Sequence, residues 1–199
     1  DGLVIDCNCL ETCRPLSGPV SGGPDAPRYD REIARAFFNL YKAHTGLKHQ
    51  TVDTVHGFTV DVYGPLSLKR NDMRLYNLSN INDRLHQLCN IRMIGDSAYP
   101  LDTNCVIYPL NGPIRPILKT IRVEVEHNYG RLATMFKFLR NLDKMKLMEN
   151  RAATKVFVVA TILRNCNVGL YGCQSASKFG VGIHPGFMQA YLTSVPDVP

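Results

Sequence analysis

The stretch IRMIGDSAYPL, residues 91–101, decides the fold of this 199-residue chain. It reads as a short apolar run without alternation, which indicates a strand that is buried on both faces and therefore central in a sheet. The run ends in a Gly-Asp-Ser turn, which presents one carboxylate, Asp96. Because ligands of open α/β sheets bind at strand ends, Asp96 is the first candidate for a functional residue.

The segments around this strand alternate between strand and helix patterns. Strands are predicted at 2–7, 47–55 and 58–65, and the last two form a hairpin that turns at His56-Gly57. Helices are predicted at 31–44, with an extended end, and at 71–88, 117–142 and 149–167. Asn71 or Asp72 is suited to cap the second helix. This order predicts an α/β fold with a mixed sheet.

Composition narrows the class of protein. A hydrophobic content of 45% can form the core of one domain, and no apolar run is long enough to span a membrane. No signal peptide is recognised, so we expect a soluble protein. The seven cysteines lie largely within apolar runs, which favours reduced thiols in an intracellular compartment. Cys7, Cys9 and Cys13 could form part of a zinc site, but no partner His/Cys pair follows at the usual spacing.

Positive charge is concentrated in the second half of the chain. The formal net charge is +6, and the basic residues crowd the region after residue 130: Arg131, Lys137, Arg140, Lys144, Lys146, Arg151 and Lys155. This distribution suits a polyanionic partner such as a nucleic acid. The alternative is an ordinary solvated helix surface.

Acidic residues lie at the joints between the predicted elements: Asp1, Asp72, Asp96 and Glu126. Clustered carboxylates suit Mg²⁺ or Mn²⁺, and a pair of such ions can cleave a phosphodiester bond. On its helix Glu126 borders the apolar stripe, whereas Glu124 is expected to face solvent. The alternatives are a turn role for Asp96, a cap role for Asp72 and a solvated Glu126.

Six segments, in this order, resemble the PIF/Harbinger type of DDE transposases: DGLVI, YKAHTGLKHQTVDTVHGFTVDVYGP, RNDMRLYN, IGDSAYPL, IRVEVEHNYGRLATMFKFL and VFVVATILRNC. The resemblance covers residues 1–168. It implies a ribonuclease H-like fold, a mixed β-sheet flanked by helices, with a divalent-metal-dependent nuclease and strand-transfer site. It assigns Asp1, Asp96 and Glu126 as catalytic metal ligands, and Asp72 as an additional metal ligand or a residue that supports the ligands.

Four departures from that family are visible. Asn71 replaces the usual histidine, the interval from Asp96 to Glu126 is short, and residues 10–30 form a loop insert rich in Pro, Gly and Ser. In the family the first aspartate lies within a strand and follows several apolar residues, whereas Asp1 begins this chain. We therefore expect an N-terminally truncated domain at 1–168 with part of a central strand missing, weak or no catalysis, and an irregular tail at 169–199.

The functional hypothesis is a DNA endonuclease or transposase-type domain that uses Mg²⁺ or Mn²⁺. Lys137, Arg140, Lys144 and Lys146 are its expected phosphate contacts. The resemblance also implies a nuclear location, a Myb-like DNA-binding partner protein and an oligomer. A domesticated, inactive scaffold that binds DNA or protein is the alternative. A small-molecule hydrolase fits less well, because the surface is basic and the chain has no Trp.

Overall fold

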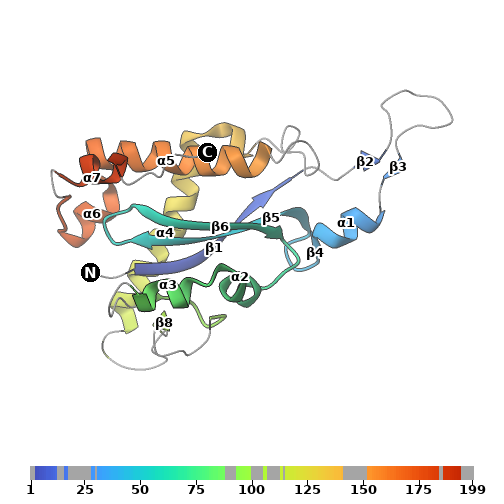
Figure 1. Ribbon diagram of the computed structural model, residues 1–199, viewed down its shortest axis with the longest axis horizontal. Helices are drawn as coiled ribbons and strands as arrows, with labels where there is room; N and C mark the ends of the chain where they lie inside the picture. The colour runs from blue at the N-terminus through green and yellow to red at the C-terminus, as the bar shows by residue number, and fades with distance from the viewer. Residues whose placement is uncertain are drawn as a thin grey trace.

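The computed structural model shows a sheet with helices packed on both of its faces (Figure 1). The structure describes residues 3–12, 16–17, 28–29, 31–87, 93–99, 105–106, 113, 115–140, 152–183 and 186–193. The strands are β1 (Leu3–Glu11), β2 (Leu16–Ser17), β3 (Arg28–Tyr29), β4 (Phe38–Asn39), β5 (His44–Thr54), β6 (Thr59–Ser67), β7 (Met93–Ile94) and β8 (Cys105–Val106).

The main sheet is mixed, and β1 lies near its middle. On one side β1 pairs antiparallel with β5 over its full length, and β5 pairs antiparallel with β6 and with the short β4. On the other side β1 pairs in parallel with β7, which pairs in parallel with β8. The predicted central position of residues 93–94 is confirmed, because β7 lies between β1 and β8. The strand β1, which was expected to lack its first part, pairs with β5 along nine residues.

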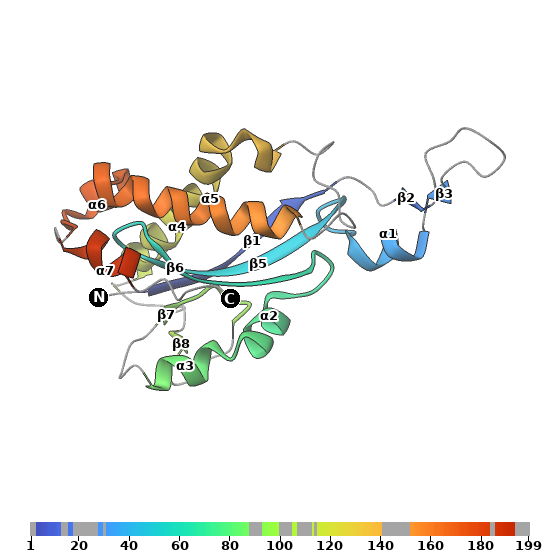
Figure 2. The ribbon, with the colours of Figure 1, turned by 45° about the horizontal axis from the view of Figure 1, so that its top comes forward.

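Helices cover both faces of this sheet. They are α1 (Arg31–Phe37), α2 (Asp72–Ser79), α3 (Ile81–Gln87), α4 (Arg115–Met135), the 3-10 helix η1 (Lys137–Arg140), α5 (Ala152–Tyr171), α6 (Gln174–Phe179) and α7 (Phe187–Thr193). Figure 2 shows α4 and α5 on one side of the strands and α2 and α3 on the other. Each described helix is too short or too polar to cross a bilayer.

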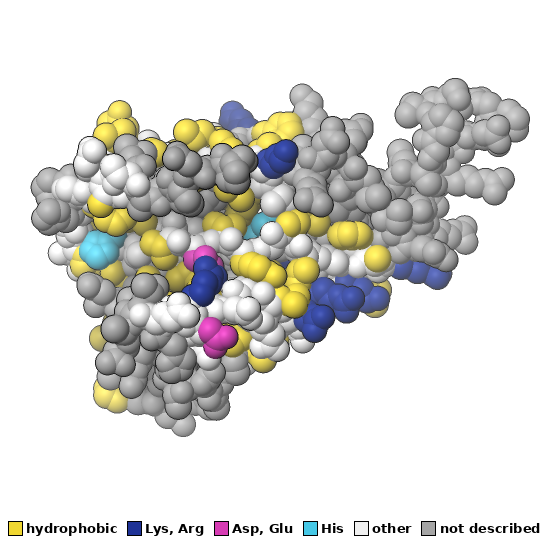
Figure 3. Space-filling model, viewed as in Figure 1, with side chains coloured by type: hydrophobic (Ala, Val, Ile, Leu, Met, Phe, Trp, Pro, Cys, Tyr) yellow, Lys and Arg dark blue, Asp and Glu magenta, His cyan; other side chains and the backbone are white. Residues whose placement is uncertain are grey.

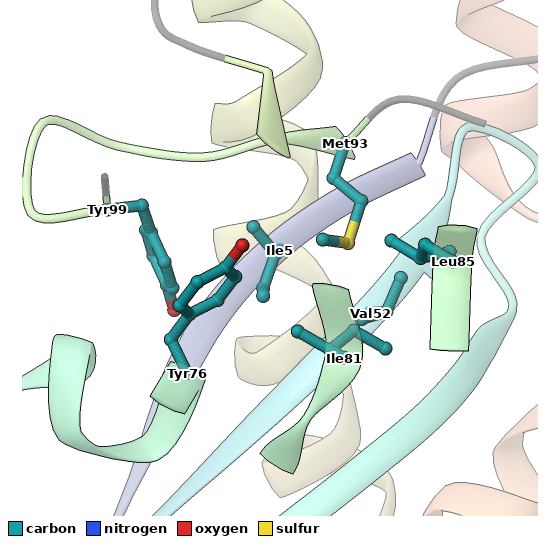
Figure 4. Close-up of a cluster of buried hydrophobic side chains, with 7 residues drawn as sticks. All are labelled: Ile5, Val52, Tyr76, Ile81, Leu85, Met93 and Tyr99. Carbon is teal, nitrogen blue, oxygen red and sulfur yellow. The ribbon is translucent and has the colours of Figure 1, made fainter. Parts of the chain in front are cut away.

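The alternation of side chains along β1 supplies both halves of the core. Ile5 points toward α2 and α3, where it packs with Val52, Tyr76 and Met93 (Figure 4). Val4 points to the opposite face and packs against Val125 of α4. Both side chains are fully buried, and burying a side chain of this size contributes about 1.5–3 kcal/mol. The same alternation places Asp6 on the α4 side with Val4.

The predicted hairpin is confirmed, but its loop has four residues instead of two. The Gly57 N–H donates to the Thr54 carbonyl (2.9 Å), and the Thr54 N–H donates to the Phe58 carbonyl (2.8 Å). Gly57 has φ of +90°, and a Cβ at this position would lie 2.5 Å from the Cys173 sulfur. Glycine is therefore required here for both its backbone conformation and its size.

The helix predicted at 71–88 is two helices. Asn71 caps α2, since its side chain accepts a hydrogen bond from the Arg74 N–H (3.1 Å). Asn80 adopts a left-handed conformation (φ 49°, ψ 28°), which ends α2 before α3 begins at Ile81. Asparagine tolerates this conformation better than most residues do. The apolar spacing continues across the break, so the pattern gave no sign of it.

The regions expected to lack regular structure contain some. The tail predicted to be irregular after residue 169 includes the end of α5 and the helices α6 and α7. Within the 10–30 insert, β1 continues to Glu11, and β2 and β3 pair as a small ribbon that lies away from the main sheet (Figure 1). The helix predicted at 31–44 ends at Phe37. The short strand β4 follows it, in agreement with the extended end that was expected there.

Candidate active site at the centre of the sheet

An open cavity of about 490 Å³ lies where β1, the end of β7 and the helix α4 meet. Five carboxylates line it: Asp6, Glu11, Asp72, Asp96 and Glu126. Its other lining residues include Cys7, Cys9, Lys42, His44, Arg122 and Tyr129. Three of the four predicted metal ligands are therefore brought to one place. The fourth, Asp1, lies outside the described residues.

Asp6, which the sequence reasoning did not select, contributes the carboxylate of β1. Its Oδ1 accepts a hydrogen bond from the Cys7 N–H (2.7 Å). Burial raises the pKa of Asp6 to about 7, and the neighbouring Asp96 and Glu126 carboxylates raise it further; the Cys7 N–H and the Arg122 guanidinium act in the opposite direction. A buried carboxyl with this pKa lacks full neutralisation by the protein.

A signal for Asp6 was present in the sequence. It follows the apolar residues Leu3, Val4 and Ile5 within a strand-like run. An acid within an apolar strand is as strong a candidate as one that precedes the strand, as Asp1 does.

Asp96 has both the turn role and the cavity position that the sequence left open. Its Oδ1 accepts a hydrogen bond from the Ala98 N–H (2.8 Å), which stabilises the turn after β7. Its Oδ2 lies 4.0 Å from Nη1 of Arg122. The carboxylate is thus oriented by the turn, while one oxygen remains available to the cavity.

Glu126 reaches the cavity from α4, but it does so as a partly exposed side chain. Its Oε1 lies 3.3 Å from Nη1 of Arg122, one helical turn earlier. The expectation that Glu124 faces solvent was wrong, because Glu124 is only 5% exposed. It binds Lys178 Nζ (2.6 Å) and accepts a hydrogen bond from the Ser175 hydroxyl (3.1 Å).

Residues of α6 therefore cover a side of α4 that the helical wheel alone treats as solvent. The Lys178 ammonium lowers the pKa of Glu124, although burial acts in the opposite direction. Glu124 is a structural group, and Glu126 remains the glutamate of the cavity.

Asp72 has its own counter-ion. Its Oδ1 lies 2.7 Å from Nζ of Lys48, which is largely buried and also donates to the Arg70 carbonyl (2.8 Å). Asp72 is therefore already neutralised, unlike Asp6. This pairing makes Asp72 a weaker candidate for direct coordination than Asp6, Asp96 and Glu126.

The donor chemistry of the cavity fits a hard divalent cation, since Asp6, Asp96 and Glu126 offer carboxylate oxygens. Within the described ranges, however, no three His, Cys, Asp or Glu side chains are arranged to hold one ion as they stand. Arg122 lies between two of the three carboxylates and takes the place of a counter-ion. Cys9 instead accepts a hydrogen bond from Lys42 Nζ (3.0 Å), and Cys13 lies outside the described residues.

The predicted phosphate contacts are partly placed. Lys137 and Arg140 are exposed on η1, and Arg140 lines an open groove of about 570 Å³ together with Arg131, His127 and Glu126. This groove shares Glu126 with the acidic cavity. Lys144 and Lys146 lie outside the described residues.

Further basic side chains follow the end of β6. Lys69, Arg70 and Arg74 are exposed between β6 and the middle of α2. On the face drawn in Figure 3, Lys and Arg side chains gather toward the end of the molecule that carries α1 and β4. Sequence reasoning did not select this second group, because it placed the charge after residue 130.

A second buried acid, Asp53, belongs to the core. It accepts hydrogen bonds from the hydroxyls of Thr51 and Thr59 (both 2.6 Å), and burial raises its pKa. The Arg164 guanidinium lies near enough to counter that rise. Since its hydrogen bonds are satisfied within the protein, Asp53 is a structural group.

Comparisons of the sequence with protein-family models and with curated proteins, and of the structure with solved structures, gave no match.

Proposed function

We propose that this chain is a divalent-metal-dependent endonuclease or transposase-type domain that cleaves DNA phosphodiester bonds. One observation carries the proposal: Asp6, Asp96 and Glu126 come from three different elements and line one cavity. A ribonuclease H-like topology is part of the proposal. The mixed sheet with helices on both faces supports it.

In this proposal Asp6 replaces Asp1 as the acid of the first strand. Asp6 lies on β1, which pairs in parallel with β7, and Asp96 lies in the turn that follows β7. Asp6, Asp96 and Glu126 would hold Mg²⁺ or Mn²⁺, and Asp72 would support them through Lys48. When bound, such ions neutralise charge on the attacking and leaving oxygens of a phosphodiester. The Asp6 carboxyl, with a pKa of about 7, can release its proton in the neutral range to accept a cation.

The basic surface supports a nucleic-acid substrate. The chain carries a formal net charge of +6, and Arg131 and Arg140 line a groove that continues from Glu126. Such side chains would bind phosphates without reading base sequence. A nuclear location, a Myb-like partner protein and an oligomer remain predictions from the resemblance.

A second candidate function is an inactive scaffold that binds DNA or protein through the same fold. The observation that favours it is the position of Arg122 between Asp96 and Glu126, where an ion would otherwise neutralise them. A scaffold of this kind binds DNA and does not cut it.

Cleavage of supercoiled plasmid in the presence of Mn²⁺ tests the proposal. We expect the unaltered chain to nick the plasmid, and Asp6→Asn, Asp96→Asn and Glu126→Gln to abolish nicking while they retain DNA binding in fluorescence anisotropy. Asp83→Asn is the matched control, because Asp83 is an exposed acid on α3 that does not line the cavity. Nicking by the three variants at the rate of the unaltered chain would refute the assignment. Binding without nicking by the unaltered chain would favour the scaffold.

A further inference from the structure

Arg122 occupies a central position among the acids of the cavity. It lies on α4 one turn before Glu126, so that both side chains share one face of the helix. Its Nη1 is 3.3 Å from Glu126 Oε1 and 4.0 Å from Asp96 Oδ2. One guanidinium thus faces carboxylates from two separate elements.

The Arg122 guanidinium makes few close interactions for a charged group that lies between two carboxylates. Its side chain is 25% exposed, and its buried Nε has no hydrogen-bond partner among the described residues. A buried, unpaired N–H is costly, and the 4.0 Å contact to Asp96 is too long for a hydrogen bond. Another ion pair of this chain has a closer geometry. Arg84 binds Asp61 through two hydrogen bonds, at 2.7 and 3.1 Å.

The charges around Arg122 explain why it stays there. Asp6, Asp96 and Glu126 carry up to three negative charges at this side of the cavity. Lys48 lies 2.7 Å from Asp72, and His44 lies 3.3 Å from Glu11, so each of these groups is paired with another acid of the cavity. Arg122 is therefore the cation that limits the repulsion between Asp96 and Glu126 when no metal ion is present.

We infer that Arg122 is the resident counter-cation of Asp96 and Glu126, which a divalent metal ion must displace in order to bind. The inference rests on the proposed function, because it concerns the same metal ligands. Arg122 is a positioning residue: it sets the affinity of the site for metal and keeps the two carboxylates apart in the metal-free protein. Its long side chain allows the guanidinium to leave while α4 stays in place.

Metal titration of Arg122→Gln tests this inference. We expect Arg122→Gln to bind Mn²⁺ about tenfold more tightly than the unaltered chain in calorimetry, a change of about 1.4 kcal/mol. We also expect a lower Tm without metal and a larger rise of Tm on addition of Mn²⁺, because the unpaired carboxylates then depend on the ion. The matched control is Lys119→Gln, which removes one positive charge from an exposed position of the same helix. It should leave the Mn²⁺ affinity unchanged.

The outcomes separate the inference from the proposed function. Equal or weaker Mn²⁺ binding by folded Arg122→Gln, with binding by the unaltered chain, overturns the role of Arg122 and leaves the metal site intact. Absence of Mn²⁺ binding by both proteins overturns the metal site and the inference with it. Arg122→Lys provides a second test should Arg122→Gln fail to fold. Its single ammonium reaches fewer oxygens, so its Mn²⁺ affinity should rise by about threefold, and an unchanged affinity refutes the inference.

Discussion

Replacing Asp6 with asparagine should stabilise the metal-free protein at alkaline pH. Asparagine has nearly the same shape as aspartate but never carries a charge, so it removes the cost of burying a carboxylate on β1. The folded protein raises the pKa of Asp6 from 3.8 to about 7. Between these two values the folded state holds a proton that the unfolded state has released, so stability falls as the pH rises through this window.

The magnitude follows from the size of this shift. About three pKa units correspond to roughly 4 kcal/mol, which is an upper limit. Because the cavity is open to water, we expect about 2 kcal/mol at pH 8.5. At pH 4, which is close to the unfolded-state pKa of 3.8, the folded state keeps the Asp6 proton and the unfolded state has released only part of its own, so the two proteins should differ little.

Urea unfolding in EDTA at pH 4 and pH 8.5 measures this difference. Asp83→Asn is the control, since it also removes one carboxylate but from an exposed site. A folded Asp6→Asn that is no more stable than the unaltered chain at pH 8.5 would refute the claim that Asp6 is a buried, uncompensated acid. Addition of Mn²⁺ should reverse the order, because only the unaltered chain can use Asp6 as a ligand.

Two further predictions concern the elements that hold the site. Glu124→Gln should destabilise the protein by about 2 kcal/mol at pH 7, because Glu124 is buried against Lys178 and Ser175. Since the pKa of Glu124 is lowered in the folded state, this difference in stability should fade as the pH falls below about 4. A difference that stays constant across this pH range in urea unfolding would contradict the ion pair. Asn80→Ala should lower the free energy of unfolding by about 1 kcal/mol, because alanine disfavours the left-handed conformation that separates α2 from α3. Asn80→Gly should leave the stability unchanged or raise it. Equal thermal stability of the two variants would contradict the role of Asn80 as a cap.

Local patterns predicted the elements well where the deciding interactions are local. The β-rich runs on both sides of Gly57 and the apolar stripe of α4 fixed a hairpin and a long helix, and both are present. The split at Asn80 escaped prediction, because one residue in a left-handed conformation leaves the apolar spacing on either side unchanged. The loop length of the hairpin likewise depends on the backbone conformation of one residue, Gly57, which has a positive φ.

The site was predicted in part, and the errors have a physical cause. Asp96 and Glu126 could be chosen from their positions at a strand end and beside a helix stripe, and both line the cavity. Glu124 was misplaced because its burial depends on Lys178, a residue 54 positions later in a region that carried no strong pattern. Asp6 was overlooked because the functional acid was expected just before the first strand, at Asp1. The acid that lines the cavity lies within that strand.

Crystals of the protein soaked with Mn²⁺ provide the most direct test that Asp6, Asp96 and Glu126 form a metal site. We predict an anomalous peak in the cavity, about 2.1 Å from carboxylate oxygens of Asp6 and Asp96, with the Arg122 guanidinium moved away from Asp96. The absence of a peak at saturating Mn²⁺, or a peak bound only outside the cavity, would contradict the account.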